Sequence, residues 1–255
     1  MMQYNDQIKE ITNKAGVYLL SHFGGLLEQH HKSDTHYDTI YDQIVSDIYK
    51  EYLVQNYPSY GFYSEEEVTD ISKLTYAWVV DPIEGTTNYS HGIPFFATQI
   101  ALIHNGEIIA AGVYLPFQDE FYYAEQSQGS FCNDVKLVIG NTASFVKSVI
   151  SIGKGTGIPN LEWWGNIIQK LAPKSRTLRF IGSTGIDLCY VAAGKLDLHI
   201  NNGSHIYDYA PGSLIAREAG AQVQNFQGKQ WNISDSDIIV GNSKLVEQSL
   251  TIIRS

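Results

Sequence analysis

Hydrophobic positions recur with a helical period near the start of the chain. Apolar residues stand three or four apart from Ile8 to Leu26, with charged residues between them, and again from Ile40 to Tyr52. Each pattern predicts an amphipathic helix. The stretch 30–38 between them is polar and contains three His. Three His could suggest zinc, but no Cys and no fixed helical pairing accompany them, so we expect a mobile loop.

The pattern then changes to short apolar runs rich in β-branched and aromatic residues. These runs predict strands at about 76–81, 96–104, 107–115 and 120–125. The pair Asn105-Gly106 between two of them favours a hairpin with a type I′ turn. Helices followed by a run of strands are typical of an α+β arrangement.

From about residue 145 onward, strand and helix patterns alternate. We expect strands at about 147–152, 177–181, 196–200 and 237–241, and helices at about 162–171, 184–193, 209–219 and 243–253. Such alternation predicts a second sheet covered by helices. We therefore divide the chain into an N-terminal α+β half, 1–144, and a C-terminal α/β half, 145–255, and expect one compact unit.

Composition narrows the possible partners. The chain has 255 residues, of which 44% are hydrophobic and 17% charged, and its net charge is −10. Nucleic-acid backbones bind clustered Lys and Arg, so this charge argues against nucleic acid as a main partner. No apolar run approaches the length of a membrane span, and no signal peptide is evident. Cys132 and Cys189 lie far apart without metal-ligand spacing, so we expect reduced thiols and a cytoplasmic protein.

The densest candidate chemistry lies in the run Asp81-Pro-Ile-Glu-Gly-Thr-Thr-Asn88. An expected buried strand precedes it, so Asp81 and Glu84 would stand where a strand ends, and Thr86 and Thr87 could cap a following helix. Carboxylates hold hard cations, and a helix N-terminus favours anions. The run predicts either a phosphate-plus-metal site or a surface turn with solvated acids.

Two further segments carry acids. Glu65, Glu66 and Glu67 end an apolar stretch, and Asp208 stands where a helix should begin. Alone, these would be a solvated acidic loop and an N-cap. The glycine-rich run 153–157 lacks the spacing of a phosphate-binding P-loop, so we expect no phosphate contact from it.

In order and spacing, these acidic segments resemble the Glu-Glu, Asp-Pro-Ile-Asp-Gly-Thr-Thr-Asn and Trp-Asp-x-Ala-Ala-Gly motifs of the inositol monophosphatase family. The likeness covers roughly residues 5–253, including Phe95–Leu102 and Phe180–Gly185. It implies the layered α-β-α-β-α sandwich shared with fructose bisphosphatases. It also implies a lithium-sensitive, homodimeric phosphomonoesterase that uses two or three Mg²⁺ and metal-activated water on inositol monophosphate or a related small sugar or nucleotide phosphate.

The resemblance also assigns roles to individual residues. The metal ligands would be Glu65, Asp81, the backbone carbonyl of Ile83, Glu84 and Asp208. Catalysis would involve Thr86, Glu65 and Asp81, with Thr86 and Glu65 orienting the attacking water. The substrate would contact Gly85, Thr86, Gly182, Ser183, Thr184 and Asn201, while Glu66 and Asp42 would support these groups from behind.

The chain departs from the family pattern at several positions. Glu84 stands where the family usually has Asp, and its extra methylene would alter the second metal position. Asn201 aligns with a Glu that contacts inositol, which would relax selectivity toward nucleotide ligands such as the 2′-phosphate of NADP⁺. Tyr207 replaces a Trp, a mild change. Glu84 also supports an alternative, a degenerate and non-catalytic homologue that acts as a metal or ligand sensor or as an assembly partner.

Overall fold

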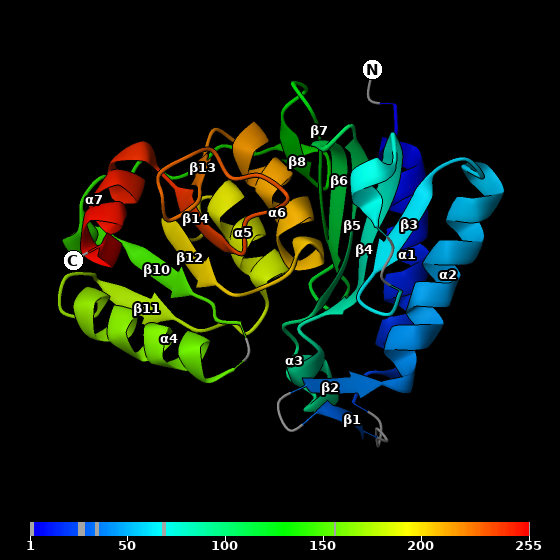
Figure 1. Ribbon diagram of the computed structural model, residues 1–255, viewed down its shortest axis with the longest axis horizontal. Coiled ribbons are helices and arrows are strands. Elements are labelled where there is room, and N and C mark those ends of the chain that lie inside the picture. Colours follow the sequence, from blue (N-terminus) through cyan, green and yellow to red (C-terminus); the bar gives the residue numbers. More distant parts are fainter. Residues whose placement is uncertain (1–2, 25–28, 34–35, 68–69, 156, 255) are drawn as a thin grey trace.

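The computed structural model describes residues 3–24, 29–33, 36–67, 70–155 and 157–254. Within them the elements stack in alternating layers of helices and sheets, as Figure 1 shows from right to left. The helices are α1 (Asn5–His22), α2 (Ile40–Asn56), α3 (Thr86–Ser90), α4 (Ile158–Leu171), α5 (Thr184–Ala192), α6 (Ile206–Glu218) and α7 (Ser243–Arg254), with short 3-10 turns at Ile71–Lys73 and Phe145–Lys147.

The first sheet has strand order β3-β4-β5-β6-β7-β8-β9. Its strands are β3 (Gly61–Ser64), β4 (Tyr76–Glu84), β5 (Ala97–His104), β6 (Glu107–Leu115), β7 (Glu120–Glu125), β8 (Ser130–Cys132) and β9 (Val135–Lys136). β3 runs parallel to β4, and the other neighbours pair antiparallel.

Both faces of this sheet are covered, which explains why its central strands are continuous apolar runs. In β4, Trp78 and Val80 join the core formed with α1 and α2, whereas Val79 joins the core formed with α5 and α6. Successive side chains of a strand point to opposite faces, so one strand serves two cores. A rigid, buried β4 results, and its carboxyl end carries Asp81 and Glu84.

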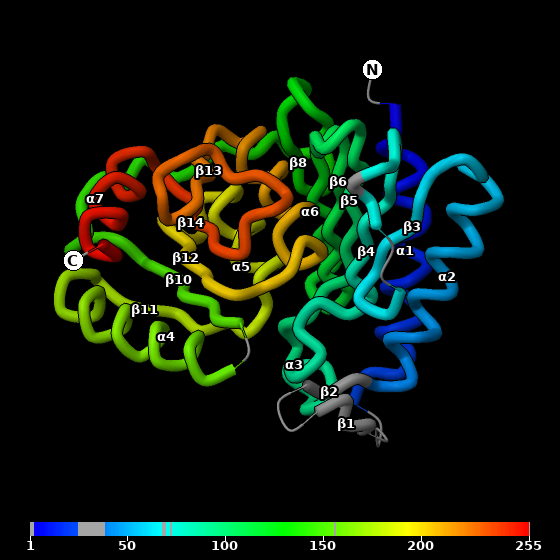
Figure 2. The backbone as a smooth tube through the Cα atoms, in the orientation of Figure 1, coloured from blue at the N-terminus to red at the C-terminus, as the bar shows by residue number. Residues whose placement is uncertain are grey.

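The second sheet has strand order β11-β10-β12-β14-β13. Its strands are β10 (Val149–Ile152), β11 (Thr177–Arg179), β12 (Leu198–Asn202), β13 (Gln222–Gln224) and β14 (Asp237–Gly241). β10 pairs parallel with both β11 and β12, so the carboxyl ends of these three strands share one edge. That edge faces α3 in the tube view of Figure 2. Crevices beyond the carboxyl ends of parallel strands are common ligand sites.

The layered sandwich agrees with the expectation from sequence, and Asn105 and Gly106 both have positive φ, 50° and 84°, as a type I′ turn requires. The stretch 30–38 differs from the expected loop. β1 (Gln29–Ser33) and β2 (His36–Thr39) pair there as an antiparallel ribbon, while residues 34–35 lie outside the described part of the chain. None of the helices in the described ranges has the length and apolarity that crossing a bilayer demands.

At the junction of β4 and α3, the structure differs from the expectation in two respects. β4 continues to Glu84 instead of ending at Asp81. The N-cap of α3 is Gly85, with φ 87°, so Thr86 and Thr87 lie inside the helix and do not cap it. A left-handed φ suits glycine, and here it turns the chain directly from strand to helix.

Candidate active site

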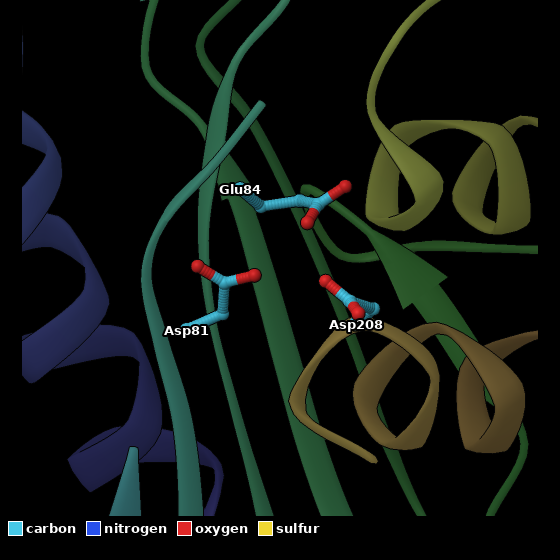
Figure 3. Close-up of side chains that lie close together, drawn as sticks. All are labelled: Asp81, Glu84 and Asp208. Carbon is cyan, nitrogen blue, oxygen red and sulfur yellow. The ribbon is translucent and has the colours of Figure 1, made fainter. Parts of the chain in front are cut away.

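Three carboxylates converge between the layers. Asp81 and Glu84 come from β4 and Asp208 from the first turn of α6, and all three point toward one another in Figure 3. One oxygen from each lies within 4.8 Å of the others. Asp81 is 2% and Glu84 5% exposed, so these are buried acids and not the solvated turn that the sequence also allowed.

A bulge in β4 places two of these acids on one side. Asp81 pairs with Gln99 and Glu84 pairs with Ala97, so three steps along β4 oppose two along β5. In a regular strand, side chains three residues apart point to opposite faces. The extra residue reverses this relation. Pro82 inside the irregular segment has no N–H to lose from the ladder.

Asp208 is oriented by its own helix. It occupies the third position of α6, and its Oδ2 accepts a 2.6 Å hydrogen bond from the backbone N–H of His205, the N-cap. The helix begins at Ile206, three residues before the position expected from sequence, so Asp208 is not the cap. The backbone bond leaves the other carboxylate oxygen for the cluster.

The local field favours a cation. Burial, then Glu84 and Glu65, raise the pKa of Asp81 well above its usual value; burial and Glu84 do the same for Asp208. Among the described residues, Asp81 Oδ1 is buried without a hydrogen-bond partner. Neighbouring buried carboxylates cost free energy unless a positive charge compensates them. Hard oxygen donors in this arrangement fit Mg²⁺.

The carboxylates open into a cavity of about 410 Å³. Glu65, at the end of β3, lines it beside Ile83, although Glu65 does not belong to the tight group of three. Gly85, Thr86, Gly182, Ser183 and Thr184 line it as well. The structure thus brings most of the expected site residues to one cavity.

Asp42 lies behind Thr86. The Thr86 hydroxyl donates to the Ile83 carbonyl at 2.8 Å and, more weakly, to Asp42 Oδ1 at 3.4 Å. Asp42 Oδ2 accepts from the backbone N–H and the hydroxyl of Thr39, the capping residue of α2. The α2 cap therefore holds the carboxylate that reaches Thr86. Glu66 does not line the cavity.

The loop before α5 completes the opposite wall. Asn88 Nδ2 donates to the carbonyls of Phe95 at 2.7 Å and Ile181 at 2.8 Å, which ties α3 to this loop. Asn201 behaves differently from the other expected substrate residues. It is fully buried, does not line the cavity, and its amide donates to the Thr184 hydroxyl at 2.9 Å.

The surroundings of Glu84 accommodate its length. Glu84 Oε1 accepts a 3.0 Å hydrogen bond from the backbone N–H of Gly185. A Cβ on Gly185 would lie 3.1 Å from Glu84 Cγ and 2.4 Å from Gln99 Oε1. Gln99 is held in turn by a 2.8 Å bond from its Nε2 to the Tyr207 carbonyl. Glycine at position 185 therefore leaves room for the extra methylene.

Several cavity residues were not anticipated from the sequence. Gly153, Lys154 and Gly155 line the cavity, so the glycine-rich run that we set aside belongs to its wall. Trp164, Phe180, Asp187 and His205 line it too. Trp164 lies in an amphipathic helix, where an aromatic residue is usually part of the core, so its sequence context does not indicate a binding site. For Phe180, the only signal in the sequence is its place two residues before Gly182.

Comparisons with known proteins identify the family of this chain. The model of the inositol monophosphatase family matches residues 3–255. An inositol-1-monophosphatase of Mesorhizobium japonicum is 35% identical over 93% of this chain and 90% of its own length. The Nus factor SuhB of Pasteurella multocida is 31% identical over 88% of this chain and 84% of its own length.

The fold also matches solved structures of similar proteins. The structure of the extragenic suppressor protein suhB from Bartonella henselae superposes with a TM-score of 0.93 at 30% identity and covers 99% of each chain. The three carboxylates that come together in the structure, from β4 and α6, belong to two of the sequence segments that resemble the family's motifs. The chain belongs to the inositol monophosphatase family.

Proposed function

We propose that this chain is a Mg²⁺-dependent phosphomonoesterase that hydrolyses inositol monophosphate or a related small sugar or nucleotide phosphate, the 2′-phosphate of NADP⁺ included. The observation that carries this proposal is the group Asp81, Glu84 and Asp208, three acids within 4.8 Å of one another at the base of an open cavity. Family membership supports a phosphatase, and the cavity supports a small substrate.

Each group of residues in the site would have its own role. The ions would be held by the side chains of Glu65, Asp81, Glu84 and Asp208 and by the Ile83 carbonyl. When bound, Mg²⁺ places positive charge beside the negatively charged phosphoryl oxygens and lowers the pKa of a coordinated water. Thr86 and Glu65 would orient the attacking water. The Thr86 hydroxyl donates to the Ile83 carbonyl and, more weakly, to Asp42. The backbone amides of Gly85 and Thr86 would bind the phosphate, and the 182–184 loop would bind the rest of the substrate.

The test is phosphate release with Mg²⁺ and with EDTA. Substrates are inositol 1-phosphate, fructose 1,6-bisphosphate, NADP⁺ and 3′-phosphoadenosine 5′-phosphate. We expect Mg²⁺-dependent release from at least one of them, and Asp47→Asn on the exposed face of α2 should not change it. Release that persists in EDTA would contradict the metal-dependent assignment.

A second candidate, a non-catalytic homologue, rests on Glu84 alone. Some relatives carry the name Nus factor SuhB, which is not the name of a phosphatase. The position of the Glu84 carboxylate in the structure weighs against this candidate, because the carboxylate reaches the other two acids despite its extra methylene. Absence of phosphate release from every substrate above, with Mg²⁺ still bound, would favour this candidate.

A further inference from the structure

Aromatic side chains form one wall of the cavity. Phe180, directly after β11, is 52% exposed, and Trp164 comes from α4. Both line the cavity, with ring centroids 5.2 Å apart and planes at 64°. This edge-to-face contact supports the Phe180 ring from one side, and half of its surface remains uncovered. An exposed aromatic ring in a polar cavity is an informative feature of a binding site.

This wall has a defined relation to the carboxylates. Phe180 stands two residues before Gly182, in the loop whose Ile181 carbonyl accepts from Asn88 of α3 at 2.8 Å. This hydrogen bond ties the loop that follows Phe180 to α3, which carries Thr86. A cavity of about 410 Å³ also exceeds what a phosphate group alone would fill.

Lys154 gives the cavity a positive group. It follows β10, is exposed, and is the only Lys or Arg among the described residues that line the cavity. Its neighbours anchor the segment, since the N–H of Gly153 donates to the Ile200 carbonyl and that of Gly155 to the Asn202 carbonyl. The backbone at Lys154 is thus held in place, while its long side chain can carry the ammonium group to a second anionic group of a ligand in the cavity.

We propose that Phe180 and Trp164 bind the planar base of a nucleoside phosphate whose ester phosphate lies at the carboxylates, with Lys154 available to a further phosphate. This inference rests on the proposed function and deepens it by assigning the residues that would select a nucleotide among its candidate substrates. Every base has a π face that stacks on an aromatic side chain, which is worth about five- to a hundredfold in affinity. A polyol has no such face, so the wall discriminates between the two kinds of substrate.

The first test compares two esters of secondary alcohols, adenosine 2′-phosphate and glycerol 2-phosphate. Phe180→Leu keeps an apolar side chain but removes the ring. We expect it to lower kcat/KM for adenosine 2′-phosphate at least about fivefold, mainly through KM, and to leave glycerol 2-phosphate within about twofold. The matched control is Phe117→Leu, because Phe117 is 53% exposed but does not line the cavity. Equal losses for both esters would overturn the proposal.

A second test needs no turnover. Adenosine, which has no ester to hydrolyse and no phosphate for the carboxylates to repel, is titrated while tryptophan fluorescence is followed, with ribose as the control. We expect saturable quenching by the nucleoside only, and its loss in Trp164→Phe. Quenching without hydrolysis of either ester would refute the phosphatase and retain the base subsite. Hydrolysis without quenching would refute the base subsite and retain the phosphatase.

The same variant separates a competing use of this surface. Phe180→Leu should leave the molecular mass in solution unchanged. A shift of mass in this variant, with unchanged kinetics on adenosine 2′-phosphate, would mean that a second copy of the chain covers Phe180, and the proposal would be wrong.

Discussion

Glu84 has one methylene more than the aspartate that its family usually has, and the neighbouring residues are arranged around that length. Its carboxylate reaches Asp81 and Asp208 and also accepts the Gly185 N–H at 3.0 Å. The missing side chain at position 185 and the longer side chain at position 84 therefore complement each other. Neither residue explains the local packing alone.

This complementarity predicts the behaviour of Gly185→Ala. The new methyl group would crowd Gln99 Oε1 and Glu84 Cγ, which should reduce the free energy of unfolding by about 1–3 kcal/mol. Glu84→Asp in the same chain should restore part of that loss, as a double-mutant cycle in urea would measure. Gly165→Ala in α4 is the control, because no atom beyond its own helix lies within 4 Å of the added Cβ in the described structure. Strict additivity would refute the coupling.

Glu84 should also set the response to lithium. If Li⁺ inhibits by taking the second metal position, Glu84→Asp should lower the Li⁺ inhibition constant, because the shorter side chain restores the family's geometry there. The measurement is phosphate release against Li⁺ concentration at fixed Mg²⁺. An identical constant in both proteins would remove Glu84 from that position.

Among the elements, periodicity located most helices and strands but not the details that build the site. The apolar run before Asp81 identified β4, yet only the pairing with β5 reveals the bulge that turns Asp81 and Glu84 to one side. The family resemblance likewise implied that Asn201 contacts the substrate, whereas Asn201 in β12 is buried and donates to the Thr184 hydroxyl. Contacts between distant segments decide both outcomes, so local patterns could not supply them.

A buried polar contact links three elements of the C-terminal half. Ser151 of β10 lies 2.8 Å from His199 Nδ1 of β12, and Asp187 of α5 lies 3.5 Å from the same nitrogen. Burial lowers the pKa of His199 from 6.5 to about 3. His199 is therefore neutral at neutral pH, and its contact with Asp187 is not an ion pair.

That pKa predicts a pH dependence of stability. As pH falls below 6.5, the unfolded chain takes up a proton at His199 before the folded chain does, so stability present above pH 6.5 is lost progressively toward pH 3. At pH 4.5 this should amount to about 2–3 kcal/mol. His199→Asn, which can still bond to Ser151, should lose less stability over the same range in urea titrations. Parallel curves would contradict the assignment.

At the scale of the molecule, residues from both sides of the chain line the site. The division between 1–144 and 145–255 is a proposal about how the chain is organised around it. Among the described residues, the carboxylates that line the cavity come from both halves: Glu65, Asp81 and Glu84 from the first, and Asp187 and Asp208 from the second. Metal binding would therefore join the halves. Figure 1 shows the contact between them formed by α5 and α6 against the first sheet.

Assembly is a separate prediction. Family resemblance favours a homodimer, so light scattering at micromolar concentration should give about twice the chain mass of 28.5 kDa. An interface of that kind buries on the order of 1,600 Å² or more in total. A mass equal to that of one chain, unchanged by added Mg²⁺, would refute the dimer and leave the site assignment untouched.

The most direct test of the whole account is titration of Mg²⁺ into the parent and Asp81→Asn proteins, with heat, melting temperature and phosphate release measured together. Asp81 is buried among like charges, and its Oδ1 has no partner in the described structure. The parent should bind Mg²⁺ and melt at a higher temperature with it. Asp81→Asn should melt no lower than the metal-free parent, lose that gain, and lose nearly all phosphate release. Unchanged Mg²⁺ affinity in Asp81→Asn, or phosphate release within about tenfold of the parent, would contradict the metal-centred mechanism.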